Sequence, residues 1–163
     1  MSTAFDPAAL PKHQYTVTVE LDAPIDKCFA AASAEEAMMA WVPNAKSIVY
    51  DHSKAPYPYG PGSARTVTLN SGTSLVEIIC LSEKPTLVGY GIPRFGMGVD
   101  TLMKGYQGRM TYESLGPNRT RLTWDGYFDC PGLRRLLEPL LRMTMKKLIT
   151  IMAGKMQKYL SAS

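Results

Sequence analysis

The feature that most constrains the fold is a series of strand-like segments between residues 45 and 129, followed by one long helical pattern at the C-terminus. Apolar and polar residues alternate along several of these segments with a period of two, which indicates strands with one buried face. The regular alternation of strand and helix that builds a parallel sheet is not seen in this region. The order therefore predicts an α+β fold whose sheet is antiparallel.

The expected elements can be placed by residue range. Residues 15–21 predict a first strand, which two short helices follow, the first opened by Pro24 and the second over residues 34–41. Residues 132–160 predict the long final helix, which Pro139 is expected to kink or restart. Six further strands are expected at residues 45–51, 63–69, 73–82, 87–92, 101–114 and 119–129.

Length and composition predict one domain. The chain has 163 residues, of which 45% are hydrophobic, and a formal net charge of +4. This is enough apolar material for a sizeable core, and the low net charge argues against disorder. We expect a single domain over residues 14–163, preceded by a flexible leader over residues 1–13 that carries two prolines and no periodic pattern.

Several classes of protein are not favoured by the sequence. Cys28, Cys80 and Cys130 are far apart and lack metal-ligand spacing, so we expect reduced thiols. Nucleophilic triads, phosphate-binding loops and dinucleotide fingerprints are not found, and we expect neither a metal nor another cofactor. The N-terminus does not resemble a secretory signal, and no run of about 18 apolar residues could span a membrane. A cytoplasmic protein is the expectation.

The C-terminal segment holds most of the positive charge. From Pro131 onward there are seven basic residues against one acidic residue, Glu138, which gives this segment a net charge of +6. Aromatic residues are not interleaved with these charges, so nucleic acid is not the expected partner. The same helix carries an apolar stripe that is expected to pack on the sheet: Leu133, Leu137, Leu140, Leu141, Thr144, Met145, Leu148, Met152, Met156 and Tyr159.

Two hairpins allow the register to be predicted. If Leu69 faces Thr73, then Val67 faces Leu75 and Arg65 faces Glu77. If Leu115 faces Arg119 in the second hairpin, the cross-strand pairs that follow are Tyr112 with Leu122, Met110 with Trp124, and Tyr106 with Phe128, and the apolar phases coincide in both hairpins. Both registers keep the apolar residues on one face of the sheet, which is expected to be the concave face.

Arg65 and Glu77 are thereby predicted to lie opposite one another on the apolar face. An ion pair between neighbouring strands stabilises a sheet modestly, which is the structural interpretation. The functional interpretation is a polar anchor inside a ligand cavity, where a few polar groups orient an apolar guest. The two interpretations are compatible.

Three stretches carry a further signal: residues 17–29, with an opening strand and an Ala-Pro helix start, residues 62–77, with a G-x-x-R…G…E hairpin, and the final amphipathic helix. In this order and spacing they resemble the START-like (SRPBCC) superfamily, which includes the polyketide cyclase/dehydrase and lipid-transport proteins. The resemblance implies a helix-grip fold, in which a curved seven-stranded antiparallel sheet surrounds the long C-terminal helix. One departure is Phe29, where members commonly have tryptophan; Trp41 follows the second helix.

The resemblance also implies a function. Members of the superfamily bind lipids, sterols, polyketides or plant hormones between the sheet and the last helix, and some are enzymes. Arg65 and Glu77 match motif positions to which the superfamily assigns no shared catalytic role. The predicted ligand-binding residues are Arg65, Glu77, Tyr90, Phe95, Met97, Tyr106, Met110, Tyr112, Trp124, Phe128, Leu141, Met145, Leu148 and Met152.

Three hypotheses for function follow. The first is a carrier or sensor of a hydrophobic small molecule, favoured by an apolar concave face with few polar groups. The second is a cyclase, aromatase or dehydratase acting on a polyketide-like substrate, with Arg65 and Glu77 as the candidate acid and base and tyrosines orienting a carbonyl group. The third is an interaction module that uses Tyr57 and Tyr59, or the basic helix, to contact a protein or peripherally an anionic membrane. Either a monomer or a homodimer is compatible with the sequence.

Overall fold

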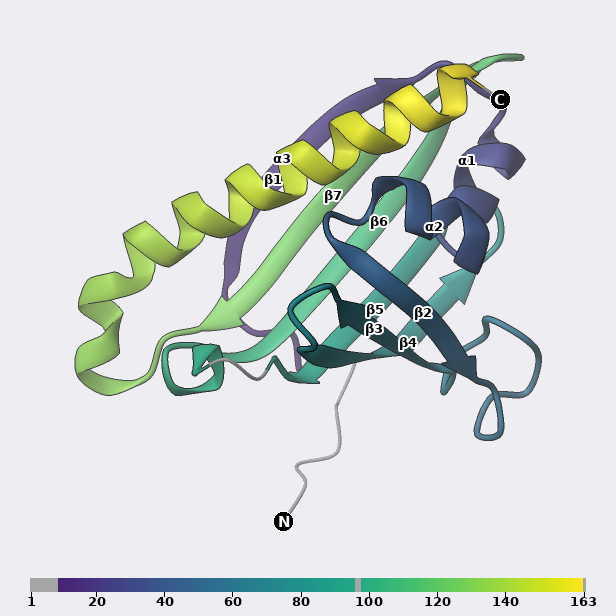
Figure 1. The fold of residues 1–163 in the computed structure, drawn as a ribbon. Coiled ribbons are helices and arrows are strands. Elements are labelled where there is room, and N and C mark those ends of the chain that lie inside the picture. The colour runs from purple at the N-terminus through teal and green to yellow at the C-terminus, as the bar shows by residue number, and fades with distance from the viewer. Residues whose placement is uncertain (1–8, 96–97, 163) are drawn as a thin grey trace.

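The computed structural model describes residues 9–95 and 98–162. Its centre is a seven-stranded antiparallel sheet in the order β1-β7-β6-β5-β4-β3-β2, so that the first strand closes against the last (Figure 1). The strands are β1 (His13–Leu21), β2 (Ala45–Asp51), β3 (Ala64–Leu69), β4 (Ser74–Glu83), β5 (Leu87–Arg94), β6 (Lys104–Gly116) and β7 (Arg119–Asp129). The predicted seven-stranded antiparallel sheet is confirmed.

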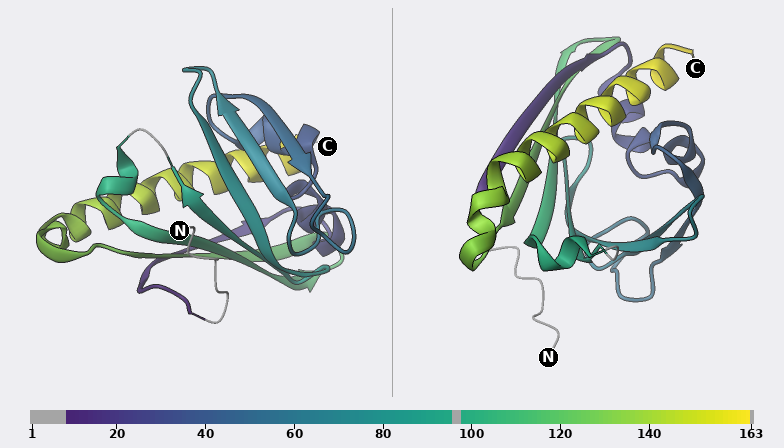
Figure 2. Two further views of the ribbon diagram at one scale, coloured as in Figure 1. Left: turned by 90° about the horizontal axis from the view of Figure 1, so that it is seen from below. Right: turned by 60° about the vertical axis from the view of Figure 1, so that its left-hand side comes forward.

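The helices lie on one side of this sheet. α1 (Ile25–Ala31) and α2 (Glu35–Trp41) follow β1, and α3 (Glu138–Ala162) runs diagonally across the concave face. The sheet bends so strongly that β2 and β3 turn back toward the helices (Figure 2). This is the predicted helix-grip arrangement, with a curved sheet around a long C-terminal helix.

Two short 3₁₀ helices lie where the sequence predicts the beginning of a strand, at residue 101, and the beginning of the final helix, at residue 132. η1 (Val99–Thr101) follows Gly98, whose φ of 76° lies in the left-handed region, so β6 begins at Lys104 rather than at residue 101. η2 (Gly132–Leu137) precedes α3, which begins at Glu138 next to Pro139. The predicted restart at Pro139 is confirmed. Proline has no backbone N–H, and in the first turn of a helix this N–H would have no hydrogen-bond partner, so proline is tolerated there. Residues 132–137 are helical, as predicted, but they form a 3₁₀ helix ahead of the α-helix.

Both predicted hairpin registers are largely confirmed. Arg65 pairs with Glu77, and Val67 with Leu75. In the second hairpin Met110 pairs with Trp124 and Tyr112 with Leu122. The predicted pair of Leu115 and Arg119 is wrong. The register shifts between Ser114 and Gly116, so Gly116 pairs with Arg119 and leaves the two-residue loop that hairpins favour.

A second register shift separates another predicted pair. The strands β6 and β7 slip by one residue between Lys104 and Gln107, next to the expected pair of Tyr106 and Phe128. These two side chains still meet, because their rings stack with centroids 6.4 Å apart and an interplanar angle of 22°. The contact is therefore made by the aromatic rings.

The core lies between the concave face of the sheet and the later turns of α3. Leu122, Trp124 and Phe128 of β7 are fully buried, as is Met156 of α3. The remaining residues of α3 that are buried are Glu138, Ile149, Ala153 and Leu160.

The predicted stripe on the final helix is buried only in part: Met156 is fully buried, and Leu141, Met145, Met152 and Tyr159 are partly buried against the core. Leu133, Leu137, Leu140 and Thr144 are exposed, because η2 and the first turns of α3 extend past the end of β7, where no strand lies beneath them (Figure 1). A helical period gives the spacing of an apolar face but not the length of sheet that covers it. None of the helices in the described part of the chain combines the length and the apolar character that crossing a bilayer requires.

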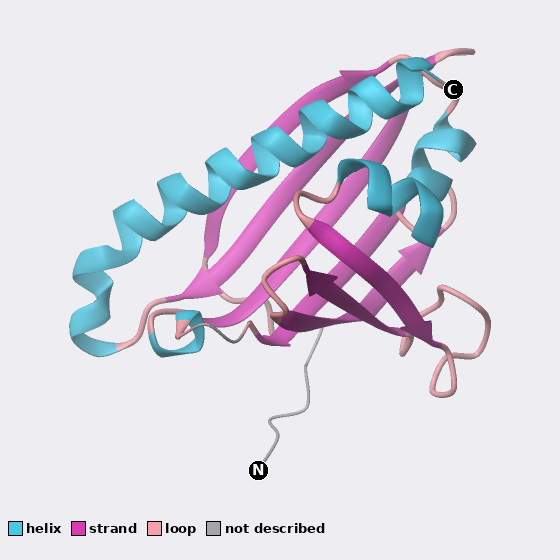
Figure 3. Ribbon diagram, viewed as in Figure 1, coloured by secondary structure: helices cyan, strands magenta, loops and turns pink. Residues whose placement is uncertain are grey.

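The loops gather at the two ends of the sheet, as Figure 3 shows. The long loop between β2 and β3 lies at the end away from η2. The β3–β4 turn and η1, which lies between β5 and β6 in the chain, are at the end nearer η2. A cavity between the sheet and the helices would therefore open toward one of these loop groups or past α3.

Candidate functional site

A cavity of about 270 Å³ lies between the concave face of the sheet and the helices α2 and α3. Fifteen of its twenty lining side chains are apolar, two are tyrosines, and the other three are Asn44, Arg65 and Glu77. The apolar wall is Met38, Trp41, Val42, Pro43, Val67, Leu69, Leu75, Ile92, Phe95, Met110, Trp124, Met145, Leu148, Ile149 and Met152.

The structure brings most of the predicted ligand-binding residues to this cavity. Met97 lies outside the described residues, and Tyr112, Phe128 and Leu141 do not line the cavity. Ten of the fourteen predicted residues do line it: Arg65, Glu77, Tyr90, Phe95, Tyr106, Met110, Trp124, Met145, Leu148 and Met152.

The three described residues that do not line the cavity lie next to it. Tyr112 has the expected strand phase, but its ring meets the edge of Phe29 of α1 at a centroid distance of 6.0 Å. Phe128 lies behind Tyr106, on which it stacks. Leu141 is only partly buried, one turn before Met145 on α3. Tyr112 and Phe128 are each placed against a neighbouring ring that strand period does not reveal.

Several cavity residues were not predicted from the sequence. Val67 and Leu75 were already expected on the same face as Arg65 and Glu77, so strand register was the signal that could have found them. The contribution of α2 and the turn after it had no comparable signal, because only the packing of α2 over β2 and α3 brings it to the wall. That group is Met38, Trp41, Val42, Pro43 and Asn44.

The polar centre of the wall is the ion pair of Arg65 and Glu77. Both donors Nε and Nη2 of the guanidinium contact Oε2 of the carboxylate. The Arg65 side chain is only 4% exposed and that of Glu77 12%. Among the described residues, no hydrogen bond reaches Oε1 of Glu77, which leaves one carboxylate oxygen for other partners.

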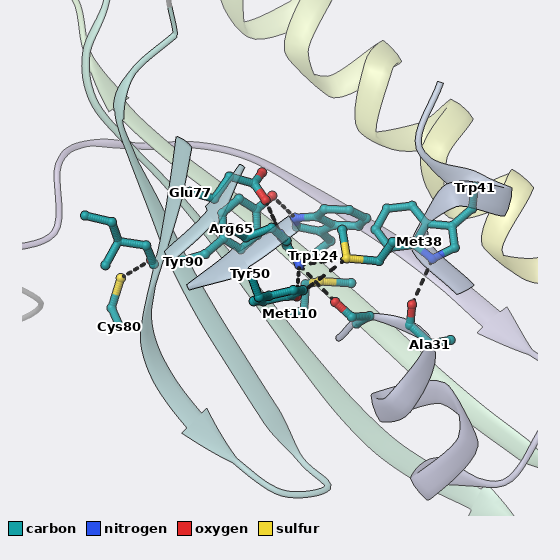
Figure 4. Close-up of polar contacts among 12 residues, drawn as sticks. Ala31, Met38, Trp41, Tyr50, Arg65, Glu77, Cys80, Tyr90, Met110 and Trp124 are labelled. Carbon is teal, nitrogen blue, oxygen red and sulfur yellow. Dashed lines mark hydrogen bonds and ion pairs between the residues drawn. The ribbon is translucent and has the colours of Figure 1, made fainter. Parts of the chain in front are cut away.

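Arg65 also ties the sheet to the helical layer, as Figure 4 shows. Its Nη1 donates to the carbonyl oxygen of Ala32 at 3.1 Å, after the end of α1, and lies 2.9 Å from the sulfur of Met38 in α2. The same atom donates to the hydroxyl of Tyr50 in β2 at 3.0 Å. Nη1 is therefore fully occupied by protein acceptors.

The Arg65 guanidinium stays protonated although it is buried. Burial lowers the pKa of Arg65, but the adjacent Glu77 carboxylate and the Tyr50 hydroxyl outweigh it and raise that pKa above its ordinary value. The rings of Tyr50 and Tyr90 add cation–π contacts, with the guanidinium carbon 5.8 Å and 5.6 Å from the two ring centroids. The pair is a fixed dipole in an apolar wall.

Tyrosine hydroxyls form the second polar feature. The hydroxyl of Tyr90 accepts a hydrogen bond from Nε1 of Trp124 at 3.2 Å, and the hydroxyls of Tyr15 and Tyr106 lie 2.7 Å apart. Burial raises the pKa of Tyr15, Tyr90 and Tyr106 above the ordinary value for tyrosine. These groups stay protonated at neutral pH, so they act as hydrogen-bond donors and acceptors and not as bases.

A second cavity of about 280 Å³ adjoins the first. The two share Ile92, Phe95 and Tyr106, and the second adds Asp100 and Lys104. The ring of Phe95 stands edge-on to that of Tyr106, with centroids 5.3 Å apart, where the cavities meet. The segment after β5 thus places one aromatic side chain between an apolar space and a more polar one.

The arrangement can enclose a small apolar molecule and offer it very few polar contacts. Each nitrogen of the Arg65 guanidinium already has a protein partner, so Oε1 of Glu77 and the hydroxyls of Tyr90 and Tyr106 are the main orienting groups for a guest. Among the described residues, no cluster of three or more His, Cys, Asp or Glu side chains could hold a metal ion.

Comparison with solved structures shows what the fold is similar to. Protein XoxI from Bacillus cereus has a TM-score of 0.71 at 12% identity, covering 92% of this chain and 96% of that chain. Norcoclaurine synthase from Thalictrum flavum, in complex with dopamine and hydroxybenzaldehyde, has a TM-score of 0.67 at 15% identity, with 91% and 86% covered. Ara h 8.0201 has a TM-score of 0.67 at 18% identity, with 91% and 99% covered. At these identities the likeness shows the fold alone.

Comparison with sequences adds the family. No curated protein matches the chain. The family model described as "Polyketide cyclase / dehydrase and lipid transport" matches residues 12–161, which is nearly the whole chain. The chain therefore belongs to the polyketide cyclase/dehydrase and lipid-transport family, with the helix-grip fold of the START-like superfamily.

Proposed function

We propose that this protein binds a hydrophobic small molecule, such as a lipid, a sterol or a polyketide, in the cavity between the sheet and α3, and acts as its carrier or sensor. The observation that carries the proposal is the cavity wall, with fifteen apolar side chains and a single ion pair whose guanidinium nitrogens all have protein partners. Such a wall gains free energy mainly by removing apolar surface from water, which favours binding over chemistry.

The size of the cavity limits the guest. A volume of about 270 Å³ lies just below the range for ligand pockets, which is roughly 300–1,000 Å³. A short acyl chain or a small polycyclic compound is a better match than a complete phospholipid. Oε1 of Glu77 accepts hydrogen bonds, so a guest that presents a hydroxyl group there is preferred over one that presents a carboxylate.

The proposal is tested by detecting a guest and then filling the cavity. Native mass spectrometry of the purified protein shows whether a small molecule is retained, and a dansyl-labelled fatty alcohol serves as the binding probe. Met145→Trp places a larger side chain in the wall and is expected to weaken probe binding by about tenfold or more. Thr144→Trp is the matched control, because Thr144 is exposed on the same helix.

The outcomes are distinct. Loss of probe binding in Met145→Trp with full binding in Thr144→Trp supports the cavity as the site. Equal binding by both variants places the probe elsewhere on the surface. A protein that retains no guest and binds neither the alcohol nor a sterol or polyketide-like aromatic contradicts the proposal.

A second candidate is a cyclase, aromatase or dehydratase activity on a polyketide-like substrate. The observation in its favour is Oε1 of Glu77, an acceptor in an apolar wall that also carries the protonated hydroxyls of Tyr90 and Tyr106. A carboxylate can accept a proton while a tyrosine hydroxyl orients a carbonyl oxygen. Turnover of a polyketide-like substrate that survives unchanged in Glu77→Gln would rule out this assignment of the base.

A further inference from the structure

The most exposed apolar surface in the described part of the chain lies outside the cavity, on η2 and the start of α3. Leu133 and Leu136 are 88% and 82% exposed. We call this surface the apolar ridge and define it as Leu133, Leu136, Leu137, Leu140 and Met143, all of which are exposed large hydrophobic side chains. They follow one another at intervals of three residues, apart from the adjacent pair of Leu136 and Leu137, so they form a continuous surface.

Exposure on this scale calls for a partner. Single apolar residues are common on protein surfaces, but a contiguous group usually marks an interaction site. η2 and the first turns of α3, which carry the ridge, extend past the end of β7, where no strand lies beneath them (Figures 1 and 2). The ridge is a protrusion and not a groove, so it suits a surface into which it can insert.

Basic side chains surround the ridge. Among the described residues, none of the basic residues on this part of the chain takes part in an ion pair. The single acidic residue of the segment, Glu138, is buried and paired with Lys12. Five exposed positive charges therefore remain available for an anionic partner: Arg134, Arg135, Arg142, Lys146 and Lys147.

These charges also argue against a second copy of the chain as the partner. A two-fold symmetric contact through the ridge would bring the same basic residues of both copies together. Like charges at close range oppose association. An anionic surface meets the same residues with attraction, and long lysine and arginine side chains can reach headgroups while leucines enter the apolar layer below.

We propose that the apolar ridge docks the protein peripherally on bilayers that contain anionic phospholipids. Leu133 and Leu136 enter the boundary between headgroups and acyl chains, and the surrounding basic residues contact the headgroups. This docking goes beyond the binding of a guest in the cavity and requires no guest. It also brings a cavity residue close to the bilayer, because Leu148 lies on α3 two turns after Leu140 and is partly exposed.

The charge contribution is tested with vesicles of phosphatidylglycerol and phosphatidylcholine in equal parts, against vesicles of phosphatidylcholine alone. In flotation assays we expect binding only to the anionic vesicles, and weaker binding at high salt. Arg134→Glu/Arg135→Glu is expected to weaken binding by about tenfold or more. Lys46→Glu/Lys54→Glu makes the same change in net charge at exposed lysines of β2 and its following loop, and is expected to keep most of the binding.

The apolar contribution is tested separately. Leu133→Ser/Leu136→Ser removes the two most exposed leucines and is expected to weaken vesicle binding, whereas Val49→Ser/Val76→Ser at exposed strand positions is the control. Leu136→Trp supplies a reporter, because Trp41 and Trp124 are both buried in the protein. Its emission is expected to shift to shorter wavelength on anionic vesicles, while that of Val49→Trp does not shift.

Each contrary outcome has a definite meaning. Equal binding to neutral and anionic vesicles, or no binding to either, overturns the proposal. Salt-sensitive binding without a shift in the emission of Leu136→Trp overturns insertion of the ridge. If light scattering without vesicles shows a dimer that the serine variants convert to a monomer, a second copy covers the ridge and the proposal is wrong.

Discussion

Arg65 and Glu77 are direct cross-strand partners in the wall of an apolar cavity, and Arg65 extends from there to the helical layer. The guanidinium thus has two roles, because it neutralises a buried carboxylate and holds the segment after α1 against β3. Glu77 keeps one oxygen for the cavity. The pair is both a structural connection and the main polar feature that a guest would meet.

Removing the guanidinium is expected to be costly. Arg65→Met leaves the Glu77 carboxylate buried without its partner and the Ala32 carbonyl without its donor, so we expect a loss of about 3–5 kcal/mol in the free energy of unfolding. The double variant Arg65→Met/Glu77→Leu is expected to lose less, because no isolated charge remains. Urea denaturation of both variants measures the difference. A double variant that is less stable than Arg65→Met would contradict this account.

Gly108 is expected to tolerate no side chain. A Cβ atom at this position would overlap the ring of Tyr90, its cross-strand partner in the cavity wall. Gly108→Ala should therefore displace that ring, lower the free energy of unfolding by roughly 1–3 kcal/mol and alter guest binding. Gly154→Ala is the opposite case, since its Cβ would meet no atom within 4 Å on α3. It is expected to stabilise the protein by about 0.5–1 kcal/mol, and thermal unfolding compares the two.

The buried tyrosines predict a dependence on alkaline pH. Burial raises the pKa of Tyr15, Tyr90, Tyr106 and Tyr112 in the folded protein, whereas in the unfolded chain tyrosine ionises near pH 10. Their contribution to stability is complete below that pH and is lost as the pH rises above it. We expect the ultraviolet absorbance of tyrosinate from these four side chains to develop only with unfolding, as followed by circular dichroism. Their ionisation in a still folded protein would show that the rings reach water.

Glu138 predicts a dependence on acidic pH. The hydrogen bond from Lys12 lowers the pKa of Glu138, so its contribution to stability is present above the ordinary glutamate pKa of about 4.3 and is lost as the pH falls below it. Glu138→Gln is expected to cost about 1 kcal/mol at neutral pH, with the difference disappearing in acid. Glu113→Gln is the control, because Glu113 pairs with Arg121 at the surface and its side chain is 62% exposed. A difference that does not change with pH would rule out the ion pair as its cause.

Much of the sheet could be predicted because its signals are local. Alternation in residues 63–69 and 73–82 placed Arg65 opposite Glu77, since a one-residue slip would have turned the apolar side chains to water. The same reasoning placed Met110 opposite Trp124. The Leu115 and Arg119 pair failed for a local reason too, because a bulge next to a short loop changes the register by one residue without altering the apolar pattern.

The residues that the sheet contributes to the cavity wall were easier to predict than those that the short helices contribute. Strand phase alone could not show that α1 covers Tyr112, or that α2 and the turn after it close the cavity with Trp41 and Asn44. Those contacts join residues that are distant in the chain, and they depend on how two short helices pack. Short helices have little pattern of their own, because seven residues make barely two turns.

The final helix shows most clearly which features the sequence determines and which depend on the tertiary structure. By itself, the sequence determined that residues after Pro131 form a helix with an apolar stripe and an excess of positive charge, because spacing and charge are properties of the chain. Only the tertiary structure decided that the stripe is buried at Met156 but exposed at Leu133 and Leu140. The physical reason is the finite length of the sheet. A helix buries its apolar face only where strands lie beneath it, and past the end of β7 the same kind of leucine faces water.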